Sequence, residues 1–581
     1  MRSLATPSRR ASSRVGALVL ALGAFIPAAC SSSTTSSSPT TPASTLASAA
    51  PGTTPVADTT PDTTPDTAPD TKPGKRPACV PAAAPAVEAK PVAGVASDFS
   101  ITSFDGTIIR AHWFPLPTAT ADKPAPTVLM GPGWGSAGDT NVNQVGLLGA
   151  LDISTLRSAG YNVLTWDPRG FGASTGTITI DSPDYEALDV KRLLDWIATM
   201  PVVQLDTVGD PRVGMVGASY GGGIQLVTAA IDCRVDAIVP IIAWHSLTTS
   251  LFKADTAKTG WAGILTLAST GRQLDPTIVR VNAAVKETGV VDPADKAWFE
   301  ARGPRDLVGK ITVPTLIIQG TVDTLFTLDE GITNFDMLRK AGVPTAMLWF
   351  CGGHGICLTK PGDTTRVARV AMAWLDRYVQ GKASASTGAR FEFVDQEGTT
   401  YTAADYPVSA GEPLTGTSGT STLALRADGG AGPLTSASTG SILDAVVGPI
   451  TPVKATNAVS VSIVAPATTT IAVGAPELTF DYSGTTPDGV QPTRVFAQII
   501  DEAAGQALGN QITPIEVVLD GQPHTVKVPL EVVAYTATAA SKLTLQIVAT
   551  TTAYAPPRFG GTINFTKVEV SLPTGMGLTA R

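Results

Sequence analysis

The chain has 581 residues and a formal net charge of -8. This length exceeds that of one ordinary domain, so we expect two folded units preceded by a segment of different character. Binding to nucleic acid requires a clustered basic face, which an acidic balance of charges does not indicate. We therefore expect a small molecule or a peptide as the partner, and no nucleic acid.

Residues 1–30 have the pattern of an export signal, in which several arginines precede the apolar stretch 15–26. Such a stretch is too short to span a bilayer. It leads through Pro27, Ala28 and Ala29 to Cys30, as in a bacterial lipoprotein signal peptide. We expect Cys30 to be lipidated and to anchor the chain to a membrane of the cell envelope. The alternative is cleavage near Ala29 without a lipid, which gives a secreted protein.

Residues 31–92 consist almost wholly of Ser, Thr, Pro, Ala and Asp, with tandem Thr-Thr-Pro-Asp repeats. A segment of this composition cannot bury enough apolar surface to form a core. We therefore expect a disordered tether that holds the folded part away from the membrane.

Residues 93–386 alternate short β-branched runs with helical patterns, which is typical of an α/β domain with a mostly parallel sheet. An antiparallel hairpin begins the domain, with its turn at Asp105 and Gly106. Later strands are expected at 127–130, 162–166, 212–216, 235–242, 315–318 and 346–350. One helix is expected to open at Asp181-Ser-Pro, and another to cover 222–232.

Two further regions depart from this rhythm. The interval 245–310 is too long for a simple crossover between strands, so it predicts an inserted helical cap. Beyond residue 387 helical periodicity is lost, and Thr-rich and Val-rich runs alternate with turns. We expect a separate β-sandwich over 387–581.

The pentapeptide Gly-Ala-Ser-Tyr-Gly at 217–221 lies between a predicted strand and a predicted helix. In that context a sharp glycine-flanked turn presents the hydroxyl of Ser219 above the edge of the sheet. The pattern alone is weak, because a Gly-rich turn without chemistry is the alternative. The strand–turn–helix context predicts Ser219 as a nucleophile.

A serine nucleophile needs a base and an acid, which in this kind of fold follow it in the order acid, then histidine. The chain has four histidines, and only His354 follows the last predicted sheet strand. Asp323 follows the preceding strand in Gln319-Gly-Thr-Val-Asp. We predict His354 as the base and Asp323 as the acid, with Asp329 as the fallback acid.

An oxyanion needs two hydrogen-bond donors. The backbone N–H of Tyr220 is one candidate. The other is expected in the glycine-rich segment 131–135, although a tight turn without a catalytic use is the alternative. We assign Asp167 and Arg169, in the turn-rich segment 166–176, a supporting role in the structure.

Four segments together resemble the X-Pro dipeptidyl-peptidase and cocaine-esterase family of serine hydrolases. They are Asp-Pro-Arg-Gly-Phe-Gly-Ala-Ser-Thr-Gly at 167–176, Gly-Ala-Ser-Tyr-Gly-Gly at 217–222, Gln-Gly-Thr-Val-Asp-Thr-Leu-Phe at 319–326, and Trp-Leu-Asp-Arg-Tyr-Val-Gln-Gly at 374–381 followed by Arg-Phe-Glu-Phe-Val at 390–394. The resemblance spans about 97–580. It implies an α/β-hydrolase fold, a C-terminal jelly roll, and a triad of Ser219, Asp323 and His354.

The sequence departs from this family at two places. Cocaine-esterase-like members place a Tyr hydroxyl as an oxyanion donor after the third strand, where this chain has Gly133 and Trp134. The indole N–H of Trp134 or a backbone N–H is expected to replace it. The cap is also shorter than in members that release dipeptides, so a site for a free N-terminus is not implied.

Apart from Cys30, four cysteines remain, an even number in an exported chain. Of the three possible pairings we favour Cys351 with Cys357, around His354, and Cys79 with Cys233. A metal site made of Cys351, His354 and Cys357 is the alternative, but it has no evident fourth ligand and would use the base. We expect no metal and no cofactor.

The function expected from these features is hydrolysis of ester or amide bonds through an acyl-enzyme. One alternative is an Xaa-Pro dipeptidyl peptidase with the same triad. A second alternative is a non-catalytic surface lipoprotein on a hydrolase fold. We expect esters and acyl amides to be better substrates than dipeptides with a free N-terminus, because 259–270 is neutral and apolar.

Overall fold

The computed structural model describes residues 79, 81, 86–143, 151–432, 450–487, 493–556 and 559–581. The expected signal peptide, with the lipidation site Cys30, and most of the expected tether lie outside these residues. None of the helices in the described part is long and apolar enough to cross a membrane.

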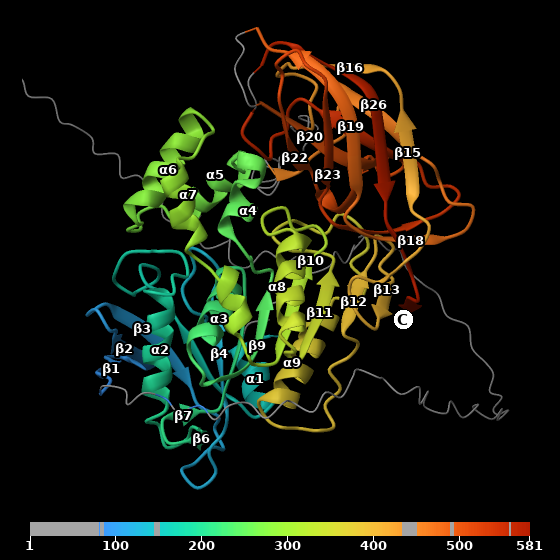
Figure 1. The fold of residues 1–581 in the computed structure, drawn as a ribbon. Coiled ribbons are helices and arrows are strands. Elements are labelled where there is room, and N and C mark those ends of the chain that lie inside the picture. The colour runs from blue at the N-terminus through green and yellow to red at the C-terminus, as the bar shows by residue number, and fades with distance from the viewer. Residues whose placement is uncertain are drawn as a thin grey trace, which may run out of the picture.

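A 12-stranded sheet forms the centre of the larger unit (Figure 1). Its order is β1-β2-β3-β5-β4-β8-β9-β10-β11-β12-β13-β28, and the strands from β5 to β12 are parallel. The strands are β1 (Ala89–Val92), β2 (Val95–Thr102), β3 (Ile108–Phe114), β4 (Thr127–Gly131), β5 (Asn162–Trp166), β8 (Val213–Ala218), β9 (Val235–Ile241), β10 (Thr315–Gly320), β11 (Thr345–Phe350), β12 (Phe391–Val394), β13 (Thr400–Ala403) and β28 (Thr579–Ala580). A small hairpin of β6 (Leu205–Thr207) and β7 (Asp210–Pro211) lies apart from it.

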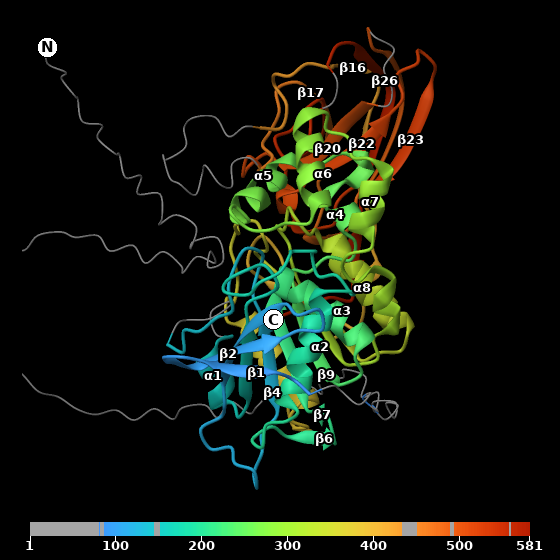
Figure 2. The same ribbon diagram turned by 90° about the vertical axis from the view of Figure 1, so that its left-hand side faces the viewer.

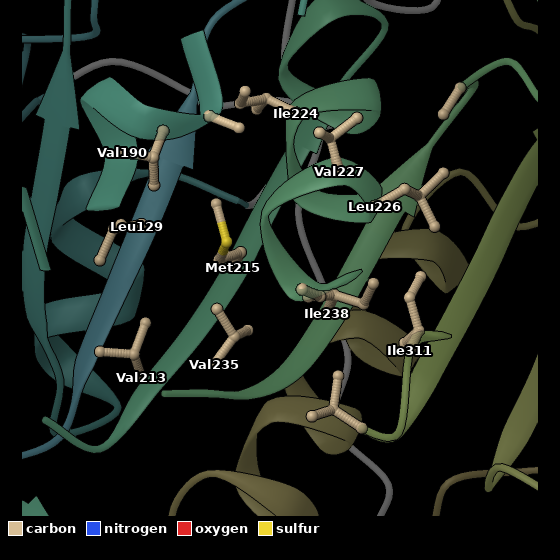
Figure 3. Close-up of a cluster of buried hydrophobic side chains, with 14 of the residues drawn as sticks. Leu129, Val190, Val213, Met215, Ile224, Leu226, Val227, Val235, Ile238 and Ile311 are labelled. Atoms are coloured by element: carbon tan, nitrogen blue, oxygen red, sulfur yellow. The ribbon is translucent and has the colours of Figure 1, made fainter. Parts of the chain in front are cut away.

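Helices cover both faces of the sheet, because strands buried on both sides need an apolar layer on each. On one face α2 (Glu186–Ile197), α3 (Tyr220–Ile231) and α8 (Leu328–Lys340) pack against the sheet in the largest apolar cluster. Figure 3 shows part of it, with Met215 of β8 facing Ile224 and Val227 of α3. On the other face lie α1 (Ile153–Ser158) and α9 (Arg366–Tyr378).

The start of α2 differs from the expectation. The sequence predicted a helix that opens at Asp181-Ser-Pro, whereas α2 begins at Glu186. Ile180 and Asp181 have φ values of 60° and 45°, which a right-handed helix cannot contain. The Glu186 side chain accepts hydrogen bonds from the backbone of Thr179 and Ser182, so it fixes the turn before the helix.

Four helices form the inserted cap between β9 and β10 (Figure 1). They are α4 (Leu247–Leu251), α5 (Thr259–Ala268), α6 (Pro276–Glu287) and α7 (Pro293–Glu300), with a 3-10 turn over Lys253–Asp255 and another over Arg305–Lys310 after α7. Asp275 and Asp292 cap α6 and α7, and a proline follows each of them at the first helical position.

The C-terminal part is a β-sandwich with its own apolar core. Its strands are β14 (Ser409–Ala410), β15 (Leu414–Ser418), β16 (Ser421–Ala424), β17 (Ala458–Ile463), β18 (Thr470–Gly474), β19 (Glu477–Thr485), β20 (Thr493–Asp501), β21 (Gln506–Ala507), β22 (Thr513–Val517), β23 (His524–Pro529), β24 (Val533–Ala537), β25 (Leu543–Val548), β26 (Thr562–Leu572) and β27 (Thr574–Met576). Figure 2 shows the cap and the sandwich together above the large sheet. The predicted class, an α/β-hydrolase fold followed by a β-sandwich, is confirmed.

At both edges of the large sheet the structure differs from the sequence-based prediction. The strands β12 and β13 were expected within the sandwich, but they extend the large sheet beyond β11, and β28 pairs with β13. At the opposite edge β1, expected within the tether, pairs with β2. Short polar strands such as β13 carry too little apolar alternation to assign them to one unit or the other.

Candidate active site

Ser219 lies in a sharp turn between β8 and α3. Its backbone has a φ of 57° and a ψ of -117°, a strained conformation for a residue with a side chain. Gly217 and Gly221 permit this turn, because a Cβ atom on Gly217 would lie 2.6 Å from the carbonyl oxygen of Gly131 on β4. A Cβ on Gly221 would approach the same oxygen still more closely. The two glycines of the motif are therefore required by close packing against β4.

The structure brings Ser219 and His354 together across 135 positions of sequence. The Oγ of Ser219 lies 2.8 Å from the Nε2 of His354, which is hydrogen-bonding distance. The Nδ1 of His354 lies 2.7 Å from the Oδ2 of Asp323. These three side chains come from the ends of β8, β10 and β11, which meet at one edge of the sheet.

The carboxylate of Asp323 is held by four N–H groups. Its Oδ1 accepts hydrogen bonds from the backbone N–H groups of Leu325 and Phe326, at 2.9 and 2.8 Å. Its Oδ2 accepts from the backbone N–H of His354 at 3.0 Å as well as from the imidazole. The side chain is fully buried. A carboxylate held in this way can orient the imidazole and stabilise the imidazolium that forms when the base takes a proton.

The fallback acid Asp329 is placed differently. It lies in the first turn of α8, and its Oδ2 is 3.3 Å from the Nζ of Lys253 in the cap. Burial, together with the neighbouring carboxylate of Glu531, raises the pKa of Asp329 above its usual range. The structure thus brings Asp323, and not Asp329, to His354.

The loop that carries His354 is closed by a disulfide between Cys351 and Cys357. This bond occupies both thiols that the alternative metal site would need. Gly353 has a φ of 124°, and a Cβ there would lie 2.5 Å from the Cβ of Asp323, so only glycine lets the two loops approach. Among the described residues no cluster of His, Cys, Asp and Glu is suited to hold a metal ion. The second disulfide joins Cys79 to Cys233, just beyond α3.

Two backbone segments can supply donors for an oxyanion: the start of α3 directly after the serine, and the loop after β4. Tyr220 is the first residue of α3, where a backbone N–H has no partner inside the helix. A Cβ on Gly133 would meet nothing within 4 Å, so the space beside this residue is open. Both N–H groups are therefore candidates to donate to a substrate oxygen.

Trp134 does not fill the expected role. Its indole N–H donates to the carbonyl oxygen of Leu265 in α5 at 3.1 Å, and its ring packs edge-on against Phe171 and Tyr220. The expectation of an indole donor is corrected, because this N–H already binds the cap. Of the two alternatives for replacing the family's Tyr, a backbone N–H is the one that the structure favours.

We expect Trp134→Phe to lower kcat by less than about threefold. The substitution keeps the aromatic contacts, and the Leu265 carbonyl still accepts a hydrogen bond from the hydroxyl of Ser269. Loss of a true oxyanion donor would instead lower kcat by about 10² to 10³. Steady-state kinetics on an ester separate the two cases, and a loss in the larger range would return Trp134 to the oxyanion hole.

A buried carboxyl group lies under the nucleophile helix. A Cβ atom on Gly223 of α3 would lie 2.6 Å from the Oδ2 of Asp181. The whole side chain of Asp181 is buried. Burial, reinforced by Glu186, raises the pKa of Asp181 well above its usual range.

The other polar residues singled out from the sequence support the fold around the site. The carboxylate of Asp167 accepts hydrogen bonds from the backbone of Gly138 and Ala173. Arg169 makes a two-point ion pair with Asp189 of α2, at 2.9 and 2.8 Å. Neither of them contacts Ser219, His354 or Asp323 among the contacts of the described residues.

The cap residue Trp261 contacts the site, and sequence order could not place it there. Trp261 of α5 packs edge-on against the His354 ring at 5.7 Å between ring centroids, and Phe326 does so at 5.0 Å. The Nε1 of Trp261 donates to the Oγ1 of Thr324 at 3.0 Å. An apolar run was the only sequence signal for Trp261, and it did not show which way the residue faces.

The comparisons with known proteins agree with the α/β-hydrolase fold. Residues 105–355 match the family model of the X-Pro dipeptidyl-peptidase (S15 family). A structure of a CocE/NonD family hydrolase from Staphylococcus aureus aligns with a TM-score of 0.58 at 12% identity, covering 83% of this chain and 93% of that one. An α-amino acid ester hydrolase aligns with a TM-score of 0.59 at 15% identity, covering 84% and 98%.

Curated relatives match shorter stretches. A polyketide transferase from a Penicillium species is 27% identical over 146 residues, which is 25% of this chain and 44% of that protein. The quorum-quenching protein AidA of Acinetobacter baumannii is 39% identical over 82 residues, or 14% and 25% of the two lengths. The chain thus spans less than half of the length of either curated relative.

The fold and the three facing side chains define a hydrolase of the serine class. More particularly, residues 105–355, which make up less than half of the chain, are similar to the X-Pro dipeptidyl-peptidase (S15) family.

Proposed function

We propose that this protein is an exported serine hydrolase that cleaves ester or amide bonds through an acyl-enzyme intermediate. The observation that carries the proposal is the continuous hydrogen-bonded chain from Ser219 through His354 to Asp323, at 2.8 and 2.7 Å. A serine hydroxyl is a poor nucleophile unless a base stands within hydrogen-bonding distance, and His354 does. This arrangement disfavours the alternative of a non-catalytic surface lipoprotein.

In the proposed reaction the Nε2 of His354 takes the proton of the Ser219 hydroxyl as the Oγ attacks the substrate carbonyl carbon. The oxyanion accepts hydrogen bonds from the backbone N–H of Tyr220 and from the backbone near Gly133. The imidazolium, stabilised by Asp323, then gives its proton to the departing alcohol or amine. Water enters by the reverse steps, releases the acid and regenerates the Ser219 hydroxyl.

Export and anchoring belong to the same proposal. The pattern of residues 1–30 supports secretion, and Cys30 supports attachment to a membrane through a lipid. Both disulfides agree with an oxidising compartment, where such bonds form and persist. We therefore propose that the enzyme is exported and lies in the cell envelope, anchored to a membrane, or that it is secreted.

The substrate is proposed to have a neutral acyl group rather than a free ammonium. Binding a buried ammonium would require carboxylates held free inside the pocket. The cap carboxylates in the described part fall into three groups. Three form ion pairs: Asp255 with Lys296, Asp295 with Arg280 and Glu300 with Arg305. Asp275 and Asp292 cap helices, and Glu287 and Asp306 are exposed to solvent. None of them is held unpaired in a closed pocket.

The helix α5 offers an apolar wall instead. Its Trp261 contacts His354, and its Ile264 and Leu265 pack in the same apolar cluster as Trp134 and Tyr220. Apolar surface at this position favours an acyl chain over a charged group. Residues of α5 are thus proposed to form part of the acyl-binding site.

A second candidate is an Xaa-Pro dipeptidyl peptidase, which the match to the S15 family model favours. It would use the same three residues and release a dipeptide with a free N-terminus. The two candidates differ only in what surrounds the acyl group, so substrates that differ only there can separate them.

We expect N-acetyl-Ala-Pro p-nitroanilide to be cleaved at least as fast as Ala-Pro p-nitroanilide, and short-chain p-nitrophenyl esters to be cleaved faster than both. The two anilides share a leaving group and differ only at the N-terminus, which is a free ammonium in one and a neutral acetamide in the other. A site built for the ammonium would prefer the free dipeptide by about 10² or more, because its carboxylates would otherwise stay unpaired. The ratio of kcat/KM values measures the preference, and a large ratio for the free dipeptide identifies a dipeptidyl peptidase.

A further inference from the structure

The loop that carries Asp323 accepts hydrogen bonds from side chains that lie outside the large sheet. This loop, called here the acid loop, covers 321–327 between β10 and α8. From the cap, the Nζ of Lys258 donates to the carbonyl oxygen of Leu325 at 2.8 Å, in addition to the bond from Trp261 to Thr324. From the sandwich, the Nε2 of Gln511 donates to the carbonyl oxygen of Asp323 itself at 2.8 Å.

Gln511 reaches the acid loop because a tight turn of the sandwich rests on it. The turn Leu508–Asn510 lies between β21 and β22, and both Gly509 and Asn510 have positive φ values, of 59° and 58°. A Cβ on Gly509 would lie 2.9 Å from the carbonyl oxygen of Thr321, so the turn touches the acid loop directly. Gln511 is 6% exposed. Its amide is therefore a buried and directed donor, and not a surface contact.

The sandwich also holds the base of the cap. The Nε of Arg494 in β20 donates to the carbonyl oxygen of Ala254 at 2.5 Å, and the backbone N–H of Ala555 donates to the carbonyl of Ala257 at 2.7 Å. Glu531 forms an ion pair with Lys253 at 2.6 Å. Lys258 and Trp261, the cap residues that donate hydrogen bonds to the acid loop, directly follow the stretch 253–257 that the sandwich binds. The sandwich therefore supports the acid loop both directly, through Gln511, and indirectly, through the cap.

We propose that Gln511 is a positioning residue for the catalytic acid, so that the C-terminal sandwich completes the triad. The inference rests on the proposed function of Ser219, His354 and Asp323. Gln511 touches neither substrate nor base, and it acts by fixing the backbone of the residue whose carboxylate orients His354. A displacement of about 1 Å in a catalytic group can cost about 10² in rate, so a single buried hydrogen bond at this place has a large effect.

Replacement of Gln511 by methionine in the full chain tests the proposal, because methionine has a similar length and no donor. We expect kcat to fall by about 10- to 10²-fold with KM changed less than about twofold. Labelling of Ser219 by a fluorophosphonate should slow by a similar factor. If the methionine variant does not fold, Gln511→Asn keeps a buried amide one methylene shorter, and we expect an intermediate loss of kcat.

The matched control is Gln498→Met. Gln498 is a buried glutamine of the same sandwich, and its Nε2 donates to the carbonyl of Val453 at 2.8 Å and to Gln546 at 3.0 Å. Its loss should lower the melting temperature without lowering kcat. An equal fall of kcat in both variants would mean that the sandwich is needed only for stability, and would overturn the proposal.

A double-mutant cycle with Asp323→Asn measures the coupling between Gln511 and Asp323. A purely structural role of Gln511 would not produce such coupling in kcat. If Gln511 works by positioning Asp323, Gln511→Met in the Asp323→Asn background should lower kcat by less than about threefold. A full repeat of the loss in that background overturns the proposal. Failure of the proposed function itself looks different, because activity and labelling would then survive in Ser219→Ala.

Discussion

Replacing Ser219 by alanine is expected to lower kcat by about 10⁶-fold, because the variant lacks the atom that bonds to the substrate carbon. The fold should be unaffected. Alanine carries the same Cβ as serine and meets the same backbone strain at φ 57°, and the Ser219 hydroxyl makes its hydrogen bond to His354 rather than to the core. Turnover of a p-nitrophenyl ester and labelling by a fluorophosphonate probe both measure the effect.

Ser250→Ala is the matched control for this experiment, since Ser250 is a buried serine in the cap helix α4. It should keep both turnover and labelling near the wild-type level. Near-normal turnover in Ser219→Ala, with an unchanged melting curve, would contradict the assignment of the nucleophile and with it the proposed function.

Asp323→Asn is expected to lower kcat by about 10⁴-fold. Four N–H groups point at this carboxylate, from Leu325, Phe326 and, twice, His354. An amide has only one oxygen, so its NH₂ must face either the backbone donors of the acid loop or the His354 imidazole. In the second case the imidazole is turned into the tautomer that cannot take the serine proton.

The companion variant is Asp329→Asn, which tests the fallback acid. Asp329 pairs with Lys253 at 3.3 Å and is not bonded to His354 among the contacts of the described residues. We expect turnover within about threefold of wild type, because the substitution leaves Asp323 in place. A loss of the size expected for Asp323→Asn would show that the acid had been misassigned. Steady-state kinetics with melting temperatures for both variants decide the question.

The candidate triad could be predicted from the sequence because each member lies at the end of a buried strand. Parallel strands end at one edge of the sheet, so the order of the strands along the chain places Ser219, Asp323 and His354 together in space. Four histidines in the whole chain left few choices for the base. Strand ranges were accurate for the same reason: continuous apolar runs such as Asn162–Trp166 are buried on both faces.

The contacts that complete the site could not be predicted in this way. Gln511 lies 188 positions from Asp323, and nothing in the run around it distinguishes it from other glutamines of the sandwich. The partner of the Trp134 indole is a backbone carbonyl in α5, which carries no side-chain signal. The start of α2 was misplaced because Asp181 and Pro183 resemble a helix opening, whereas tertiary packing holds Asp181 under α3.

The anchoring of the cap base by the sandwich bears on how this enzyme can be divided or recombined. A boundary drawn after β13 would leave Lys253 and Asp329 without Glu531, and would remove the donors that Arg494 and Ala555 supply to the backbone carbonyls of Ala254 and Ala257. The net contribution of one such hydrogen bond is about 0.5 to 1.5 kcal/mol, because water replaces the lost partner. The sandwich therefore cannot be exchanged alone for one from a relative. The replacement would need matching donors at the positions of Arg494 and Gln511 and a matching carboxylate at the position of Glu531. The cap would have to be exchanged together with it.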